Sequence, residues 1–590
     1  MSNPTRRQFL ADAGRLGTAA AVTALLPRLT ARPAAAAPGG RSVAVFGAGV
    51  AGLTAAHELA ERGFAVTVYE RSQHLGGKAW SIDVPGSATG GRDPLMAEHG
   101  FRFFPGFYFN LGDTMRRTPL PGGGTTYDQL VRASTYRTAL EGRADLTVPL
   151  SLPPMGYTPD AFEQTVLAAF KELSLLPADE AAYFVAKLWT YVSSCDARRL
   201  GQWEYVSWSD FIRESDMSAE YRKIVSRSLV RNLAATKSSD ASTHAIGLVG
   251  LATVMSIIGQ GNDVNGTVDR VLNGPTSEVW LRHWVDHLTS LGVTFNLGTT
   301  ITGLDVADRA ITGATAADAS GGMHQVTADH YVCAIPCERM AALLSPQLLA
   351  ADPSLAGIAK LKTDWMNGLV FHLRERLDLT NGHVNYVDSP FAVTSISQAQ
   401  FWKRDLSQYG DGTVKESFST IVSDWVTPGI LYGKTAKECT PQEIANEVWA
   451  QIKAHVNDTG VVLSDDMLHS WYLDPAIINP GTSGVTNDTP LFVQDPGGWY
   501  NRPTSTTKVR NLFLAGDWVQ TKINVTTMDG ANQGGRTAAN GVLDAAGYFG
   551  SRASVHGLYV PPEFEPFRAA DAFAYAARQP NAFDPDHTRP

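Results

Sequence analysis

The feature that most constrains the fold is a glycine-rich turn between a short apolar run and a helical pattern. Residues 43–46 are apolar and partly β-branched, as expected of a buried parallel strand. The glycines that follow have the spacing GxGxxG: the first permits a tight turn, the second lets the backbone approach a pyrophosphate, and the third lets the helix pack close to the strand. We therefore predict a nucleotide site whose first contacts are Gly47, Gly49, Val50, Ala51 and Gly52.

A helix and a second strand continue the motif. Residues 51–62 favour a helix, Gly63 is placed to end it, and residues 65–69 read as a strand. Glu70 follows, 23 residues after Gly47, where a carboxylate accepts hydrogen bonds from an adenosine ribose and repels a 2′-phosphate. The alternative is a glycine-rich turn in some other α/β unit, but strand, turn, helix, strand and acid all agree.

The residues after this acid distinguish one dinucleotide from another. The stretch ERSQHLGGKAWS adds two adjacent glycines, whose N–H groups can cradle phosphate, and a lysine that supplies a point charge. This arrangement resembles the extended FAD signature of the flavin amine oxidase and carotenoid desaturase superfamily, in which arginine is usual at the position of Lys78. The resemblance implies non-covalent FAD, with Arg71, Gly77 and Lys78 among its contacts. It also implies an α/β fold of the glutathione-reductase-like class.

The cofactor domain is expected to be discontinuous, with α+β insertions. Its first part is 41–124. In its second part, 271–344, Thr276 or Ser277 caps a helix, residues 293–306 form the next strand pair, a hairpin turns at 320–322, and the strand HYVCAIP follows. Ile301, in this part, is assigned as a cofactor contact.

The third part, 491–550, resembles the C-terminal flavin motif of the same superfamily. A buried strand at 512–515 is followed by Gly516 and Asp517, whose carboxylate is placed to bind the ribityl hydroxyls or to orient the diphosphate. The run 528–531 then opens a helix whose positive N-terminus would face the reduced ring, so Met528 and Ala531 are also assigned as contacts. This segment contains no cysteine, so a thioether to the flavin is excluded there.

The remaining segments are assigned to substrate binding and to the chain ends. Residues 125–270 carry helical patterns and form the first part of a substrate domain, and residues 345–490 carry strand-like runs and form the second. The tail, 551–590, is rich in proline and phenylalanine and is expected to wrap the surface.

Three further stretches narrow the resemblance. Residues 97–119, 273–288 and 382–402 look like the bacterial phytoene and ζ-carotene desaturase-like branch. By that resemblance the aromatic loop after Glu98 passes near the isoalloxazine, which assigns Gly100, Phe101 and Arg102 as cofactor contacts. Aromatic clusters are core more often than pocket, so most of these rings are expected to pack beneath the cofactor.

The N-terminal end predicts export. Arg6 and Arg7 precede an apolar stretch at 16–26 and small residues at 34–37, the order of a twin-arginine signal peptide over 1–37. The apolar stretch is far shorter than the roughly 20 residues of a membrane-spanning helix. A disordered, alanine-rich leader is the alternative. We expect an extracellular, periplasmic or cell-envelope location, and no spanning segment elsewhere.

Charge and cysteine content exclude several classes of function. The net charge is −9 and no run of Lys and Arg interrupts the interior, so nucleic acid is not expected as a partner. The four cysteines lack the spacing of a zinc site, and no metal is expected.

These inferences lead to an FAD-dependent oxidoreductase with a small-molecule substrate. The first hypothesis is a desaturase or dehydrogenase that passes hydride from a lipophilic, isoprenoid-like substrate to flavin N5, with O2 or a quinone as the final acceptor. The second is a secreted amine or amino-acid oxidase that releases H2O2, and the third is a flavin-carrying protein without turnover. No catalytic residue is assigned; the ionisable candidates are His99, Arg102, His372, His383 and His469. Amine oxidases often carry a lysine before an apolar strand that positions a water at flavin N5, and Lys362 is the candidate for that lysine under the second hypothesis.

Overall fold

The computed structural model describes residues 41–100, 103–153, 156, 158–232, 236–262, 268–524 and 526–590. The expected signal peptide, residues 1–37, lies outside this part of the chain, and so do Phe101 and Arg102.

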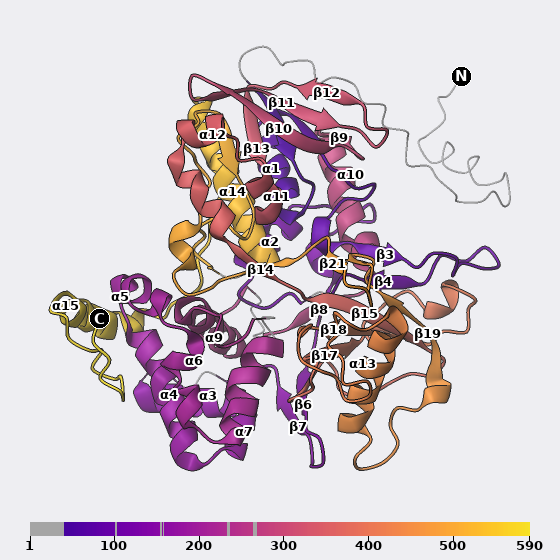
Figure 1. The fold of residues 1–590 in the computed structure, drawn as a ribbon, viewed down its shortest axis with the longest axis vertical. Coiled ribbons are helices and arrows are strands. Elements are labelled where there is room, and N and C mark those ends of the chain that lie inside the picture. Colours follow the sequence, from indigo (N-terminus) through magenta and orange to yellow (C-terminus); the bar gives the residue numbers. More distant parts are fainter. Residues whose placement is uncertain are drawn as a thin grey trace, which may run out of the picture.

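A five-stranded parallel sheet forms the centre of the upper domain in Figure 1. Its order is β23 (Leu512–Leu514), β13 (His330–Cys333), β1 (Ser42–Phe46), β2 (Ala65–Tyr69) and β9 (Thr294–Asn296). Every neighbouring pair is parallel, and the strands come from three stretches far apart in the sequence. The discontinuous Rossmann-type domain predicted from the sequence is therefore confirmed.

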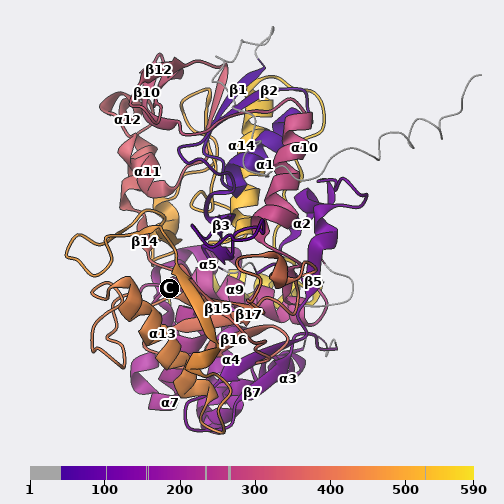
Figure 2. The same ribbon diagram turned by 90° about the vertical axis from the view of Figure 1, so that its right-hand side faces the viewer.

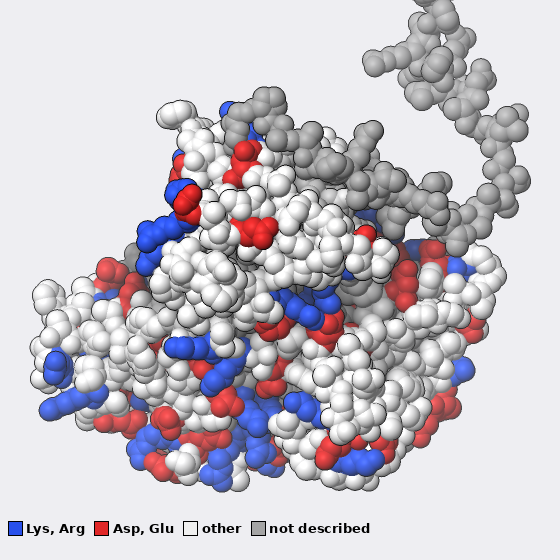
Figure 3. All heavy atoms as spheres, turned by 45° about the horizontal axis from the view of Figure 1, so that its top comes forward, with Lys and Arg blue, Asp and Glu red and all other residues white. Residues whose placement is uncertain are grey.

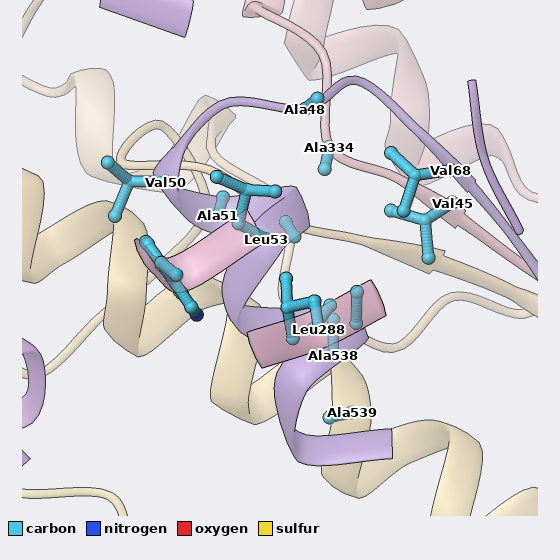
Figure 4. Packing of buried hydrophobic residues seen from close by; sticks show 14 of the residues in the cluster. Val45, Ala48, Val50, Ala51, Leu53, Val68, Leu288, Ala334, Ala538 and Ala539 are labelled. Atoms are coloured by element: carbon cyan, nitrogen blue, oxygen red, sulfur yellow. The ribbon is translucent and has the colours of Figure 1, made fainter. Parts of the chain in front are cut away.

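Three helices pack closely on this sheet. They are α1 (Val50–Ala60), α10 (Arg282–Ser290), which continues the π-helix η7 (Ser277–Leu281), and α14 (Met528–Ala545). A Cβ on Gly535 of α14 would stand 2.4 Å from the carbonyl oxygen of Ala51, so only glycine permits this crossing. Figure 4 shows the small side chains Ala538 and Ala539 of α14 and Leu288 of α10 beside α1.

A second, three-stranded sheet lies at the top of the molecule in Figure 1. It consists of β10 (Thr300–Ala307), β11 (Ala310–Ala317) and β12 (Met323–Val326), all antiparallel. The turn predicted at 320–322 joins β11 to β12 as expected. The strand pair predicted over 293–306 is corrected: β9 belongs to the parallel sheet and β10 to this one, so the two strands do not pair. Helices α11 (Cys337–Ala342) and α12 (Pro346–Ala351) follow.

The helical insertion lies below the cofactor domain (Figures 1 and 2). It includes α3 (Pro159–Ala169), α4 (Ala178–Ser193), α5 (Asp196–Gly201), α6 (Trp208–Phe211), α7 (Ala219–Tyr221), the π-helix η6 (Arg222–Arg231) and α9 (Thr243–Ile257). All of these elements except α5 contribute side chains to one hydrophobic core.

The second insertion is built on a seven-stranded sheet. Its order is β19 (Leu468–Leu473), β15 (Asn367–Leu373), β18 (Glu416–Val422), β17 (Val393–Ser397), β16 (His383–Tyr386), β6 (Thr135–Ala139) and β7 (Leu146–Pro149). Helix α13 (Pro441–Val456) shares a core with this sheet. Residues 125–270 were expected to be helical, but β6 and β7 come from that segment, because β6 pairs in parallel with β16.

Short elements connect these parts. They are β3 (Ser81–Asp83), β4 (Met96–Glu98), α2 (Phe109–Arg116), β5 (Leu130–Arg132), β8 (Arg270–Leu272), β14 (Lys362–Asp364), β20 (Ile477–Ile478), β21 (Thr486–Asn487) and β22 (Leu491–Val493). Among the helices of the described ranges, none has both the length and the apolar character needed to cross a bilayer.

The C-terminal tail, which was expected to wrap the surface, is instead packed into the helical insertion. It contains α15 (Glu565–Ala576), which packs on α4 and α5 beside the label C in Figure 1. Phe564 is fully buried in the core of the helical insertion. The buried Lys187 of α4 forms an ion pair with Asp584 at 2.7 Å, and Arg198 of α5 forms one with Asp571 at 2.9 Å. The tail therefore completes the helical insertion.

Acidic and basic side chains are intermingled on the face shown in Figure 3.

Candidate functional site

The glycine-rich turn between β1 and α1 combines two different kinds of glycine. Gly47 has φ +99°, and a Cβ on Gly52 would stand 1.9 Å from the carbonyl oxygen of Gly47, so both positions are fixed by the fold. Gly49 has φ −72°, and a Cβ there would meet only the Cα of Gly77, at 3.9 Å. The space in front of Gly49 is therefore open, as a pyrophosphate-binding turn requires.

Glu70, which follows β2, is buried and forms a hydrogen bond with the glycine-rich turn. Its carboxylate accepts hydrogen bonds from the Ala48 N–H (2.8 Å) and from the N–H and hydroxyl of Ser72 (2.9 and 2.7 Å). The N–H of Thr299 donates to the Glu70 carbonyl at 2.8 Å, which brings the start of β10 beside the acid. Ile301 lies two residues further on, partly buried. These two predicted contacts are thus placed together.

The second glycine pair closes against the first turn. The Gly76 N–H was expected to face phosphate, but it donates to the Ala48 carbonyl at 2.8 Å and is occupied by the protein. Gly77 has φ +56°, and a Cβ there would approach the Cα of Gly49 to 2.9 Å. This close contact with Gly49 explains why residue 77 must be glycine.

Lys78 and Arg71 are the two predicted cations next to this loop, and both contact residues 488–490. The ammonium group of Lys78 donates to the Pro490 carbonyl, and Arg71 forms an ion pair with Asp488 at 2.6 Å. Arg71 is partly exposed, so of the two cations Lys78 is the one directed inward.

Asp517 belongs to the third segment of the cofactor domain and lies near Lys78 of the first segment. Burial raises the pKa of the Asp517 carboxyl, and the positive charges of Lys78 and Arg502 act against that rise. Lys78 and Asp517 are therefore electrostatic neighbours although 439 positions separate them in the sequence. Such proximity is what one cofactor site built from the first and third segments requires.

The start of α14 is held in place by a buried acid whose role the sequence did not reveal. The hydroxyl of Thr527 caps the helix by accepting the Gly530 N–H at 2.9 Å, and Met528 and Ala531 are partly buried in the first turn. The Asp529 carboxylate accepts hydrogen bonds from the Asn110 amide (2.9 Å) and the Leu111 N–H (2.6 Å). Burial raises the pKa of Asp529 to about 6.

These residues fit FAD. The open space at Gly49 suits a diphosphate, and Glu70 keeps lone pairs for ribose hydroxyls. Asp517 and the capped N-terminus of α14 supply an acceptor and a partial positive charge for the flavin half.

A histidine–aspartate pair lies beside the loop that leads to Gly100. The imidazole Nδ1 of His99 is 2.5 Å from the Asp474 carboxylate, and both side chains are almost fully buried. Burial raises the pKa of Asp474, but the charge and hydrogen bond of His99, with hydrogen bonds from the Ala476 N–H and the Asn367 amide, lower it overall. The Asn367 amide donates to the same carboxylate at 2.7 Å. No sequence motif links positions this far apart, and sequence reasoning missed the pair.

The other ionisable candidates differ in how deeply their side chains are buried. His372 is buried, its Nε2 lies 3.0 Å from the Met96 carbonyl, and burial lowers its pKa to about 4, so it is a neutral structural residue. His469 lies 3.1 Å from Asp411 near the surface. The Lys362 side chain is 63% exposed and forms an ion pair with Asp495 at 3.0 Å, so it does not reach a buried flavin.

His383 lies nearer to the aromatic loop. Its Nδ1 is 2.5 Å from the buried Asp269 carboxylate, and its ring contacts Phe103 edge-on at 5.5 Å between centroids. Phe104, Phe107 and Tyr108 are buried in the core of the cofactor domain, as expected for most of these rings.

One group of side chains within the described ranges has the spacing of a metal site: His57, Glu61 and His287. The Nδ1 of His57 accepts the indole N–H of Trp284 at 3.1 Å, so its proton lies on Nε2 and is directed at Glu61, 3.0 Å away. His57 therefore offers no lone pair to an ion shared with Glu61. The four cysteines are all buried thiols.

Comparison with known proteins agrees with this geometry. Residues 50–543 match the model of the flavin containing amine oxidoreductase family. The chain is 23% identical to a carotenoid phi-ring synthase of Chlorobaculum tepidum, over 85% of this chain and 88% of that one. It is also 23% identical to a probable zeta-carotene desaturase of Synechococcus elongatus, over 85% and 98% of the two chains.

Solved structures with the same fold include amine oxidases. Putrescine oxidase bound to putrescine superposes with a TM-score of 0.56 at 14% identity, covering 85% of this chain and 99% of that one. Cyclohexylamine oxidase from Brevibacterium oxydans superposes with a TM-score of 0.52 at 14% identity, covering 86% and 98%. With its Rossmann-type domain and a site whose residues fit FAD, the chain belongs to the flavin-containing amine oxidoreductase family.

Proposed function

We propose that this FAD-dependent oxidoreductase is a desaturase or dehydrogenase that removes hydride from a lipophilic, isoprenoid-like substrate. The observation that carries the proposal is the similarity, over 85% of the chain, to a carotenoid phi-ring synthase and a probable zeta-carotene desaturase. A small molecule is the substrate class, and O2 or a quinone is the proposed final acceptor.

The protein's part in such a reaction is binding and orientation. FAD supplies the hydride acceptor when bound. The turn at Gly49 and the Glu70 carboxylate hold the nucleotide half, while Asp517 and the start of α14 hold the flavin half and favour negative charge there. Phe103 and His383 pack edge-on against each other in the segment that resembles the loop near the isoalloxazine, and ring surface of this kind would suit an apolar substrate.

An amine or amino-acid oxidase is the second candidate, and the family description favours it. In amine oxidases a lysine often positions a water at flavin N5, and Lys362 is the candidate for that lysine here. Its exposed ion pair with Asp495 does not support this role. The desaturase proposal does not depend on such a lysine.

Anaerobic reduction of the purified holoenzyme distinguishes the two candidates. The flavin absorbance is followed after addition of polyenes and terpenoids in detergent, and separately after addition of amines and amino acids. We expect bleaching by a member of the first group alone. Bleaching by putrescine, cyclohexylamine or another amine, with none by the isoprenoid compounds, would contradict the desaturase proposal.

We also propose export through the twin-arginine pathway, which moves folded, cofactor-loaded proteins. The support is the order of Arg6 and Arg7, the apolar stretch and the small residues in the sequence. Replacing both arginines with lysine should leave the protein uncleaved in the cytoplasm. Unchanged secretion of this double variant, measured by fractionation and immunoblot, would refute the proposal.

A further inference from the structure

A cavity of about 400 Å³ opens in the helical insertion, away from the glycine-rich turn of the cofactor domain. It lies among α6, the short 3-10 helix η5 (Glu214–Asp216), the π-helix η6 and the loop residues 237–239. Its wall contains four cationic side chains and two carboxylates: Arg222, Arg227, Arg231, Lys237, Asp210 and Glu214. The remaining lining residues are serines.

The π-helix is what gathers three of these arginines. Arg222 and Arg231 are nine positions apart, about two and a half turns of an α-helix, which would put them on opposite faces. In a π-helix the bonds join residues five apart, as in the Asn232 N–H to the Arg227 carbonyl. The wider turn brings Arg222, Arg227 and Arg231 to one wall. Segments of π-helix are rare and occur often at functional sites.

The positive charge of this wall is only partly neutralised. Arg227 pairs with Asp388 and Arg231 with Asp424, neither of which lines the cavity. Arg222 donates to the neutral Met217 carbonyl at 2.8 Å. Within the part of the chain that the structure describes, Arg222 and Lys237 form no ion pair.

The two carboxylates of the wall already have hydroxyl donors. Asp210 accepts the Ser207 hydroxyl at 2.7 Å, and Glu214 accepts the Ser238 hydroxyl at 2.6 Å. These bonds direct the carboxylates toward protein donors and leave the cationic groups of the wall as the ones available to a ligand.

A buried hydroxyl in the wall also lacks a partner. Ser226, 1% exposed, lines the cavity, and its Oγ makes no hydrogen bond with any described residue. Buried hydroxyl groups without a partner are rare in native proteins, and a ligand oxygen in the cavity would supply one. This is a second observation, independent of charge, that indicates a ligand.

We propose that this cavity binds a phosphate-bearing anion at a site separate from the FAD site. Guanidinium groups, an ammonium group and serine hydroxyls are the donors with which proteins bind phosphate oxygens. The volume is that of a small-molecule site and exceeds what one inorganic phosphate fills, so a diphosphate or a phosphorylated head group suits it. The proposal does not depend on the identity of the oxidised substrate.

Calorimetric titration of the FAD-saturated, full-length protein with inorganic pyrophosphate tests the proposal, because saturation fills the diphosphate site of the cofactor domain. We expect saturable binding at one site. Arg222→Gln and Lys237→Gln should each weaken it at least tenfold, while Arg510→Gln, an exposed arginine of the cofactor domain, should leave it unchanged. Bound FAD and circular dichroism show that each variant is folded, and Lys237 lies outside any helix or strand, where substitution disturbs no regular element.

Vesicles separate the two sources of phosphate. Sedimentation with vesicles containing phosphatidylglycerol, reversed by pyrophosphate, would assign the site to a lipid head group. Pyrophosphate binding without vesicle binding would assign it to a soluble ligand. No saturable pyrophosphate binding, or equal affinity in the wild type and both glutamine variants, would overturn the proposal.

Discussion

At the scale of single residues, the nucleotide-binding motif was predictable because the residues that define it lie close together in the sequence. Gly47, Gly49 and Gly52 are required by the backbone within one turn, and Glu70 follows within the same βα unit. The partners of His99 and Asp529 were not predictable, because Asp474 and Asn110 lie hundreds of positions away and no periodicity connects them. Tertiary pairing of this kind leaves no signal in a single sequence.

The space around Gly49 is open and the space around Gly52 is filled, so substitutions at these two glycines should have different outcomes. In Gly49→Val the new side chain enters the open space in front of the turn, so the protein should fold but bind no FAD. In Gly52→Ala the Cβ would collide with the Gly47 carbonyl at 1.9 Å, so the fold itself should be lost or strongly destabilised.

The ratio of flavin to protein absorbance and the thermal unfolding midpoint of each variant test this contrast. A yellow Gly49→Val protein, or a Gly52→Ala protein of unchanged stability, would show that the open side of the turn has been misassigned.

At the scale of elements, most helices and strands of the cofactor domain follow from hydrophobic periodicity, whereas strand partners do not. Residues 293–306 were correctly expected to contain two strands, yet β9 and β10 enter different sheets because β9 finds its edge position beside β2. Residues 135–149 lie in a segment expected to be helical, but they extend the seven-stranded sheet. The π-helix η6 also has no sequence signature distinct from an α-helix.

The helical insertion contains a buried acid that should make its stability depend on pH. Burial raises the pKa of Glu172 to about 7, from 4.5 when exposed. Because the folded protein holds this proton more tightly, the contribution is complete below pH 4.5 and is lost as the pH rises through 7. The loss amounts to at most about 3 kcal/mol.

Glu172→Gln removes this titration while keeping the shape of the side chain. Urea unfolding at pH 5 and pH 8 should therefore show that the variant gains stability relative to the wild type at the higher pH. An equal difference between the two proteins at both pH values would mean that Glu172 ionises normally.

At the scale of the whole molecule, the C-terminal tail is a more integral part of the fold than its composition suggests. The tail was expected to wrap the surface, yet its Asp584 and Asp571 are buried against Lys187 and Arg198 of the helical insertion. Breaking a buried ion pair by removing one partner leaves an uncompensated charge.

Lys187→Met should therefore lower the free energy of unfolding by about 3–5 kcal/mol. Arg568→Met is the matched control, because its partner Asp196 is largely exposed and such pairs contribute little. Chemical denaturation measures both variants. A Lys187→Met protein as stable as this control would show that the tail is not an integral part of the insertion.

The central claim is that distant segments of the chain build one FAD site, in which Asp517 and Lys78 are electrostatic neighbours. Equilibrium titration of the apoprotein with FAD tests it most directly. Removal of the carboxylate in Asp517→Ala leaves a buried cofactor group unpaired, at a cost of about 1–3 kcal/mol. FAD affinity should therefore fall by roughly one to two powers of ten. Equal affinity in the wild type and Asp517→Ala would contradict the assignment of the C-terminal flavin motif and with it the three-part site.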